Sequence, residues 1–222
     1  MTEELWATVD NYLVSLLSPS DDALDKALSE SDAAGLPRIN VAPNQGKLLE
    51  LLAKSHGARR ILEIGTLGGY STIWLARSLS DGGQLVSLEL ETKHADVARS
   101  NIKRAGLESV VEIRVGPAAS SLRDLIGENV EPFDLIFIDA DKEGYPEYFA
   151  LSLELSRVGT MIIADNVVRA GGIVDPQSTD ERVLAVRAFL ELVAEEDRVE
   201  ATAVQTVGSK GYDGFALMLV KK

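Results

Sequence analysis

Five short, almost continuously apolar segments alternate with helix-like segments from residue 59 onward. The apolar segments are RRILEIG (59–65), QLVSLEL (84–90), VVEIRVG (110–116), FDLIFID (133–139) and GTMIIAD (159–165). Between them, apolar residues recur with helical spacing at about residues 70–80, 92–105, 118–127 and 144–157. Strands that are apolar on both sides and separated by helices indicate a parallel sheet covered on both faces. The pattern therefore predicts a doubly wound, Rossmann-like α/β fold.

The two ends of the chain depart from this alternation. Before the first strand, helices are predicted over residues 3–17, 20–33 and 44–57, with Ser20 in the cap of the second and Gly57 closing the third. After a helix at about 179–195, strand patterns at 198–207 and 215–220 flank the turn GSKGYDG. A short glycine-rich turn joins strands into a hairpin, so at least one C-terminal strand is expected to be antiparallel. With no linker or repeat, residues 1–222 are predicted to form a single domain.

Composition excludes several classes of function. The 222 residues carry a net charge of −13 with no run of Lys or Arg, so no nucleic-acid partner is expected. The absence of cysteine excludes disulfides and thiolate metal sites. The N-terminal segment is acidic where a signal peptide would be basic, and no apolar stretch approaches the roughly 20 residues that span a bilayer. We therefore expect a cytoplasmic protein with no membrane partner.

The stretch LEIGTLGGYST (62–72) predicts a strand, a glycine-rich turn and a helix, an arrangement that often binds a nucleotide. A dinucleotide fingerprint would place glycines at 65, 67 and 70, but Leu67 and Tyr70 occupy the last two positions. No Gly-Lys-Ser/Thr follows, which excludes a P-loop. Glycines at 65, 68 and 69 suit a ligand that contains adenosine without a pyrophosphate. S-adenosylmethionine (SAM) is such a ligand.

Two carboxylates near this turn fit the same hypothesis. Glu63 lies inside an apolar strand, where an unpaired charge is costly. Glu89 ends the next strand, where an acid can accept hydrogen bonds from ribose hydroxyls. Taken alone, Glu89 fits an exposed charge at a strand end equally well.

A second group of polar residues follows two other strands. Asp139, Asp141 and Lys142 end one strand, and Asp165 and Asn166 end the next. Carboxylate and amide oxygens suit Mg²⁺ or Ca²⁺, and Lys142 beside such a cation is a candidate general base. The alternative is that the acids cap strand ends and the lysine is solvated. His56 and His94 stand alone in helical segments and are expected at the surface rather than as metal ligands.

The ordered set of these motifs resembles a known family. LEIGTLGGYS, SLELE, VGPA, FDLIFIDADKEGY and ADNV occur in the order and at about the separations found in cation-dependent class I O-methyltransferases. The chain is similar to the catechol and caffeoyl-CoA type, particularly its small bacterial members, from about residue 36 to the C-terminus. This resemblance implies a doubly wound methyltransferase sheet, SAM as methyl donor and a divalent cation, Mg²⁺ first with Ca²⁺ or Mn²⁺ as alternatives. It also implies a small catechol-like or caffeoyl-type phenolic acceptor.

The resemblance assigns roles to particular residues. For the methionine and ribose parts of the cofactor it implies Val41, Glu63, Gly65, Thr66 and Ser71, with Glu89 on the ribose hydroxyls, Ala118 at the adenine and Asp139 and Asp141 nearby. For the metal it implies Asp139, Asp165 and Asn166. For catalysis it implies Lys142 as the base, with Asp139 beside it.

Two regions depart from the family's pattern. VVRAGGIVDPQ follows Asn166, where related sequences often carry a Trp-Gly pair, so the loop with Arg169 is expected to alter acceptor specificity. The N-terminal 35 residues match the family only generally. Within the single domain, residues 1–57 are expected to form helices of the lid and acceptor region, and residues 58–222 the cofactor-binding core. Because family members are commonly homodimers, the N-terminal helices are also expected to contribute to a dimer interface.

Two other functions remain as alternatives. One is an NAD(P)-dependent oxidoreductase, against which the glycine spacing argues. The other is a non-catalytic nucleoside-binding module, which would have no use for a lysine beside a group of metal-ligating oxygens.

Overall fold

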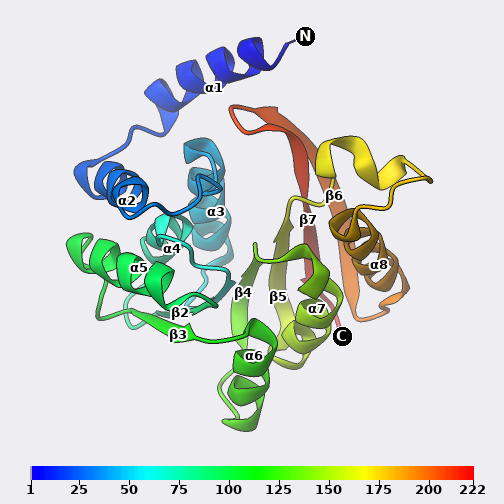
Figure 1. The fold of residues 1–222 in the computed structure, drawn as a ribbon. Helices are drawn as coiled ribbons and strands as arrows, with labels where there is room; N and C mark the ends of the chain where they lie inside the picture. The colour runs from blue at the N-terminus through cyan, green and yellow to red at the C-terminus, as the bar shows by residue number, and fades with distance from the viewer. Residues whose placement is uncertain (1) are drawn as a thin grey trace.

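The computed structural model describes residues 2–222, which form helices around one seven-stranded sheet in the order β3-β2-β1-β4-β5-β7-β6 (Figure 1). The strands are β1 (Arg60–Ile64), β2 (Gln84–Glu89), β3 (Val111–Val115), β4 (Phe133–Ile138), β5 (Ser156–Asp165), β6 (Val199–Gly208) and β7 (Gly211–Val220). The first five pair in parallel, and β7 pairs antiparallel with both β5 and β6. The predicted doubly wound sheet with an antiparallel C-terminal hairpin is confirmed.

Helices cover both faces of the sheet, as Figure 1 shows. The α-helices are α1 (Glu3–Leu17), α2 (Asp22–Ala33), α3 (Pro43–His56), α4 (Tyr70–Ala76), α5 (Thr92–Arg104), α6 (Ala118–Gly127), α7 (Tyr145–Glu154) and α8 (Glu181–Glu195). Two 3₁₀ segments, η1 (Lys142–Gly144) and η2 (Arg169–Val174), follow β4 and β5. Helices α2 to α5 lie on one face of the sheet and α6 to α8 on the other.

The alternation of side chains along each strand divides the interior into two cores. On β1, Leu62 and Ile64 face the core under α6 to α8, whereas Ile61 faces the core under α3 and α4. Successive side chains of a strand point to opposite faces, so Glu63 must project on the same side as Ile61. A carboxylate is thereby carried into an apolar layer, next to the start of α4.

Some helix and strand boundaries differ from those expected from the sequence. They differ where a capping side chain or the pairing register of two strands sets the boundary. Asp21, rather than Ser20, caps α2, because its carboxylate accepts hydrogen bonds from the N–H groups of Ala23 and Leu24. The C-terminal hairpin has a tighter turn than predicted. Gly208 pairs with Gly211, so that most of the supposed turn GSKGYDG belongs to β7. The αL conformation of Gly57 at the end of α3 is as expected.

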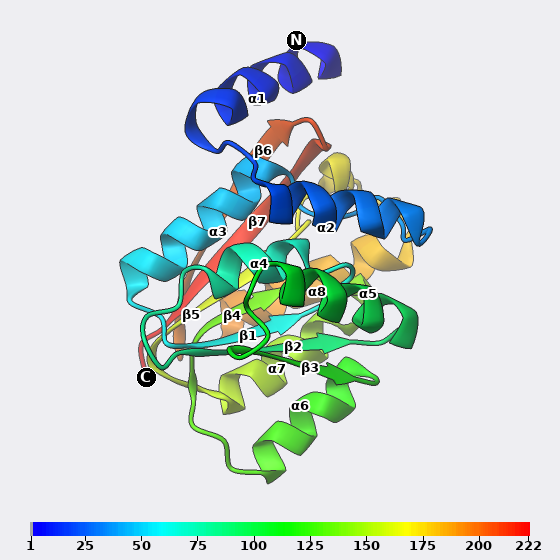
Figure 2. The same ribbon diagram turned by 90° about the vertical axis from the view of Figure 1, so that its left-hand side faces the viewer.

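Helix α1 lies beyond the carboxyl ends of the parallel strands, against the β6–β7 turn (Figure 2). Its Asp10 accepts hydrogen bonds from the backbone N–H of Ser209 at 2.7 Å and from the side-chain amide of Asn44 at 3.0 Å. One carboxylate therefore ties α1 to the hairpin and to α3. No helix within residues 2–222 is long and apolar enough to cross a membrane.

Candidate active site

A cavity of about 710 Å³ opens at the carboxyl ends of β1, β2 and β4. Every site residue predicted from the sequence lines this cavity except Glu63 and Asp165. Those that line it are Val41, Gly65, Thr66, Ser71, Glu89, Ala118, Asp139, Asp141, Lys142 and Asn166. Open α/β sheets bind ligands at this edge, and the volume suits a small-molecule ligand or cofactor.

The glycine-rich turn owes its composition to two different neighbours. Gly65 has φ +103°, and a Cβ there would lie 2.0 Å from the carbonyl oxygen of Asp139, so only glycine fits between β1 and β4. A Cβ on Gly68 would instead lie 2.0 Å from Ser31 Oγ on α2. Of the three glycines, only Gly65 lines the cavity. The spacing noted in the sequence therefore reflects helix packing as well as ligand access.

Glu89 holds the backbone of this turn in place. Its carboxylate is buried and accepts hydrogen bonds from the N–H groups of Thr66 at 3.2 Å, Leu67 at 2.7 Å and Glu91 at 2.9 Å. His94 Nδ1 lies 3.3 Å from the same carboxylate. Expected at the surface, His94 is partly buried and lines the cavity. No spacing pattern marked it, because its place depends on α5 packing beside β2.

We expect Glu89→Ala to weaken binding of an adenosine-containing ligand while the sheet and its helices stay folded, although the glycine-rich turn loses the carboxylate that its N–H groups contact. Losing one charge-assisted hydrogen bond costs about 1.5–3 kcal/mol, which is roughly a tenfold to hundredfold rise in Kd. Calorimetry with SAM measures the change, and circular dichroism checks the fold. An unchanged Kd would reduce Glu89 to a structural partner of the turn.

Glu63 is fully buried one layer behind the cavity wall. Its carboxylate accepts hydrogen bonds from the hydroxyls of Ser71 at 2.6 Å, Thr72 at 2.5 Å and Ser87 at 2.6 Å. Burial outweighs these hydrogen bonds and raises the pKa of Glu63 to about 7. Ser71 lines the cavity, so Glu63 acts on the site by orienting the first turn of α4.

The raised pKa of Glu63 predicts a pH dependence of stability. Between pH 4.5 and about 7 the folded chain retains a proton that the unfolded chain has lost, so the unfolding free energy falls as pH rises through this window. The contribution is at most about 3 kcal/mol, at about 1.4 kcal/mol per pKa unit. Denaturant unfolding at pH 5 and pH 8 should show this loss in the wild type and a smaller loss in Glu63→Gln, where Asp165, whose pKa is also raised, still contributes. Parallel pH profiles for the two proteins would contradict the assignment.

Lys142 lies at the junction of β4 and η1, in a network that fixes its amine. Its Nζ lies 3.1 Å from Asp139 Oδ1 and donates to the hydroxyl of Tyr145 at 2.6 Å. Tyr145 is fully buried and donates in turn to the carbonyl oxygen of Asp165 at 2.8 Å. This tyrosine ends the motif FDLIFIDADKEGY, but only the fold reveals that it orients the lysine and joins the ends of β4 and β5.

Asp165 and Asn166 lie beside this network, where the first cavity meets a second one of about 430 Å³. Asn166 lines both cavities, and Asp165 lines the second. Burial, and then the nearby Asp139 carboxylate, raises the pKa of Asp165. Gln45 on α3 donates to Asp165 Oδ2 at 2.7 Å. No sequence pattern indicated Gln45, which is far from Asp165 along the chain.

The oxygen atoms at this junction fit a hard divalent cation. Within residues 2–222 no group of three or more His, Cys, Asp or Glu side chains is arranged to hold a metal ion. The candidate set instead combines the carboxylates of Asp139 and Asp165 with the amide of Asn166. Asn166 has φ +57°, an uncommon conformation that is often retained at functional sites. Like charges kept close at a buried position are stabilised when a cation binds between them.

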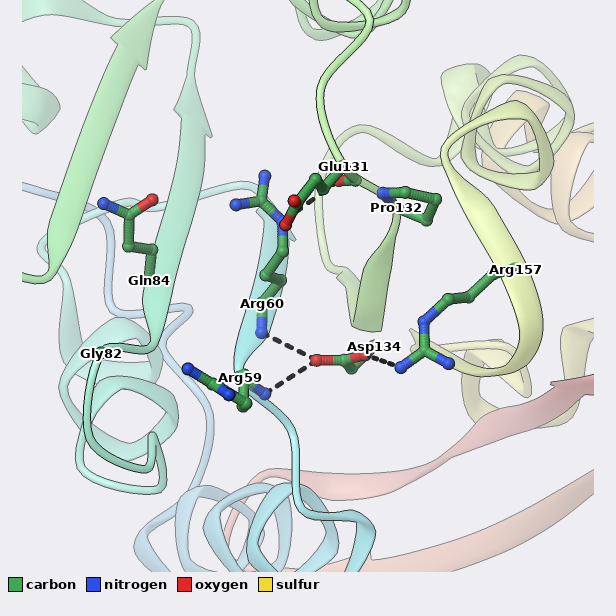
Figure 3. A pocket seen from close by; sticks show the side chains of 8 residues that line it. All are labelled: Arg59, Arg60, Gly82, Gln84, Glu131, Pro132, Asp134 and Arg157. Carbon is green, nitrogen blue, oxygen red and sulfur yellow. Dashed lines mark hydrogen bonds and ion pairs between the residues drawn. The ribbon is translucent and has the colours of Figure 1, made fainter.

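A further hollow of about 440 Å³ lies at the opposite edge of the sheet, where the strands begin (Figure 3). Its Asp134 accepts hydrogen bonds from the N–H groups of Arg59 at 2.8 Å and Arg60 at 2.9 Å, and pairs with the guanidinium of Arg157. Burial opposes ionisation of Asp134, but these donors outweigh it and lower its pKa. The arginine side chains in Figure 3 point in different directions. The cluster therefore ties strand ends together and offers no convergent binding site.

Comparison with known proteins shows the family of the chain. The sequence matches the O-methyltransferase family over residues 18–221. The chain belongs to the O-methyltransferase family. Catechol O-methyltransferase of Niastella koreensis is 51% identical over 221 residues, which cover 100% of both chains.

Solved structures of this family share the whole fold. The O-methyltransferase of Bacillus cereus in complex with SAH is 57% identical, with a TM-score of 0.98 over 99% of this chain and 100% of that one. An O-methyltransferase of Streptomyces achromogenes involved in tomaymycin synthesis, solved in complex with SAM, is 48% identical, with a TM-score of 0.96 over 100% of each chain. The resemblance drawn from the sequence motifs is thus confirmed, and the chain is an O-methyltransferase.

Proposed function

We propose that this O-methyltransferase transfers the methyl group of SAM to one hydroxyl of a small catechol-like acceptor and requires a divalent cation. The observation that carries the proposal is the single cavity that joins the glycine-rich turn to Asp139, Lys142 and Asn166. A nucleoside-binding module needs only the first part of this cavity. The catechol O-methyltransferase relative and the structures with SAH and SAM support the same function.

The cofactor end of the cavity suits SAM better than NAD. Glu89 lies at the end of β2, Ala118 begins α6, and Gly65 leaves the turn open to the ligand. Leu67 and Tyr70 line the wall where a dinucleotide fingerprint needs glycines for the pyrophosphate and for close helix packing. Tyr70 is buried, so it cannot swing away to admit a longer ligand.

The reacting end of the cavity supplies a positioned base. Asp139, Asp165 and Asn166 would hold the cation, which when bound acts as a Lewis acid and lowers the pKa of a coordinated hydroxyl. Lys142 is anchored by Tyr145 and Asp139 and lines the cavity, where its amine would take the hydroxyl proton. The enclosing residues would keep acceptor and methyl donor in near-attack geometry, which supplies much of the rate in such reactions.

Residues 1–57 complete the acceptor side in this proposal. Ile39, Asn40 and Val41 line the cavity between α2 and α3. Helix α1 exposes several large apolar side chains, which support a homodimer with α1 in its interface: Leu5, Val9, Tyr12, Leu13, Leu16 and Leu17. Light scattering at micromolar concentration tests that assembly.

Parallel calorimetric titrations with SAM and NAD test the cofactor, and we expect binding of SAM alone. A methyl-transfer assay with catechol, with Mg²⁺ and with a chelator, then tests the reaction. Comparable affinity for NAD would support an oxidoreductase instead. SAM binding without methyl transfer to catechol would contradict the proposed acceptor.

A further inference from the structure

The loop that follows Asn166 has an unusual backbone that projects one arginine toward the reacting end of the cavity. Arg169 and Ala170 have φ +54° and +53°, and Gly171 has φ +86°. Left-handed conformations are uncommon for residues other than glycine, and a run of them persists only where the surroundings enforce it. In Figure 1 this loop is the yellow segment between the β6–β7 hairpin and α8.

Asp213 on β7 enforces this backbone. Its Oδ1 accepts hydrogen bonds from the N–H groups of Val168 at 3.0 Å, Arg169 at 3.0 Å and Gly214 at 2.9 Å. From the other side, the guanidinium of Arg187 on α8 donates to carbonyl oxygens of the loop. The position of Arg169 is therefore built into the fold.

The side chain of Arg169 is 21% exposed and lines the cavity together with Lys142 and Asn166. Within residues 2–222 its Nε is buried without a hydrogen-bond partner. Its Nη1 lies 3.9 Å from Asp213 Oδ2, which is too far for a hydrogen bond. A guanidinium offers five N–H donors, and leaving them unpaired on burial is costly.

Among residues 2–222, none of the acidic groups around Arg169 accepts a hydrogen bond from its side chain. Asp213 receives three backbone N–H groups on Oδ1 and faces Arg169 with Oδ2 at 3.9 Å, and Asp180 is paired through both oxygens with Arg182 at the rim of the cavity. Tyr145 is fully buried and neutral, because its burial raises its pKa well above the usual value. Glu143 is exposed at the rim. The donors of Arg169 therefore remain available to a ligand in the cavity.

We propose that Arg169 determines acceptor specificity by pairing with a carboxylate carried on the ring, or on a short side chain, of an aromatic vicinal diol. A planar guanidinium matches a carboxylate through two parallel hydrogen bonds. Arg169 lies three residues after Asn166, so the acid and the diol of one small acceptor can be held together. The inference rests on the proposed function, because it assumes that the acceptor occupies the reacting end of this cavity.

The test compares two acceptors that differ only in charge, 3,4-dihydroxybenzoate and 3,4-dihydroxybenzyl alcohol. With SAM and Mg²⁺, we expect the full-length enzyme to favour the benzoate in kcat/KM. Arg169→Gln should lower that preference at least about tenfold, as expected for a lost charge-assisted pair, while the alcohol changes less than about threefold. A left-handed backbone is as unfavourable for glutamine as for arginine, so the substitution should not change the conformation of the loop.

Arg123→Gln is the matched control, because it removes the same charge from the exposed face of α6, outside the cavity. It should leave the ratio of the two acceptors as in the wild type. The inference would be overturned if wild type and Arg169→Gln had the same ratio of kcat/KM for the two acceptors. It would also be overturned if Arg123→Gln lost as much of the preference for the benzoate as Arg169→Gln.

Calorimetry of 3,4-dihydroxybenzoate with the SAH-loaded enzyme gives a second readout that needs no turnover. We expect Arg169→Gln to raise Kd about tenfold or more, since charge-assisted hydrogen bonds are lost. If neither diol is methylated but Kd shifts, the proposed reaction fails while the carboxylate site stands. If methylation proceeds but Kd and the ratio are unchanged, the proposed reaction stands and the role of Arg169 is refuted.

Discussion

Asp165→Ala should reduce methyl transfer by more than about a hundredfold, because in the proposed site it removes a cation ligand and a compensating charge together. A Lewis acid contributes several kcal/mol to such a reaction, and each 1.4 kcal/mol or so is a factor of ten in rate. Chelation of the wild-type enzyme should abolish turnover, and added Mg²⁺ should restore it. Titration of Mg²⁺ into Asp165→Ala should show weakened binding alongside the lost activity.

A measurement of unfolding distinguishes the loss of a metal ligand from damage to the fold. Asp165 is buried, and its pKa is raised because burial and the Asp139 carboxylate oppose its charge. Asp165→Asn keeps the side-chain volume but only one acceptor oxygen, whereas the carboxylate accepts from both Gln45 and the N–H of Asn166. Removal of the buried charge offsets the lost hydrogen bond, so without metal the free energy of unfolding should stay within about 1 kcal/mol of the wild type. The metal hypothesis would be contradicted if an Asp165 variant retained full activity in the presence of a chelator. It would also be contradicted if the variant lost activity only because it unfolds.

Lys142→Ala should slow the chemical step by roughly 10²–10⁴-fold while SAM and Mg²⁺ still bind. In the proposed mechanism the amine of Lys142 is the base, and the hydrogen bonds that it donates to Tyr145 and Asp139 hold it in place. Single-turnover kinetics measure the step, and calorimetry checks both ligands. Raising the pH should recover part of the rate, because more of the acceptor hydroxyl then ionises without a base.

Lys142→Arg separates the base from the charge. Arginine keeps the positive charge near Asp139, but it stays protonated and cannot accept the proton. It should therefore be nearly as slow as the alanine variant and show the same recovery at high pH. Full activity of Lys142→Ala at neutral pH would make the lysine a bystander.

Local sequence patterns predicted the sheet and the helices that cover it, because each strand or helix depends mainly on residues close to it in the chain. The apolar runs FDLIFID and GTMIIAD had to lie in a covered parallel sheet, since strands exposed on either face would alternate with polar residues. The residues that end those runs, among them Asp139, Asp165 and Asn166, were then bound to meet at one edge. The boundaries of individual strands do not follow from local patterns alone. The start of β7 at Gly211 depends on its pairing with Gly208, which no local pattern reveals.

The sequence by itself determined the class of fold, the binding edge and ten of the residues that line the cavity, because the positions of the strands and of their ends follow from apolar periodicity. Tertiary structure alone decided how those residues are held. Gln45 reaches Asp165 from α3, and Tyr145 joins Lys142 to the end of β5. Asp213 fixes the backbone that carries Arg169. Such contacts join residues that are distant in the chain. They depend on the direction and burial of each side chain, which are set only when the helices and strands pack together.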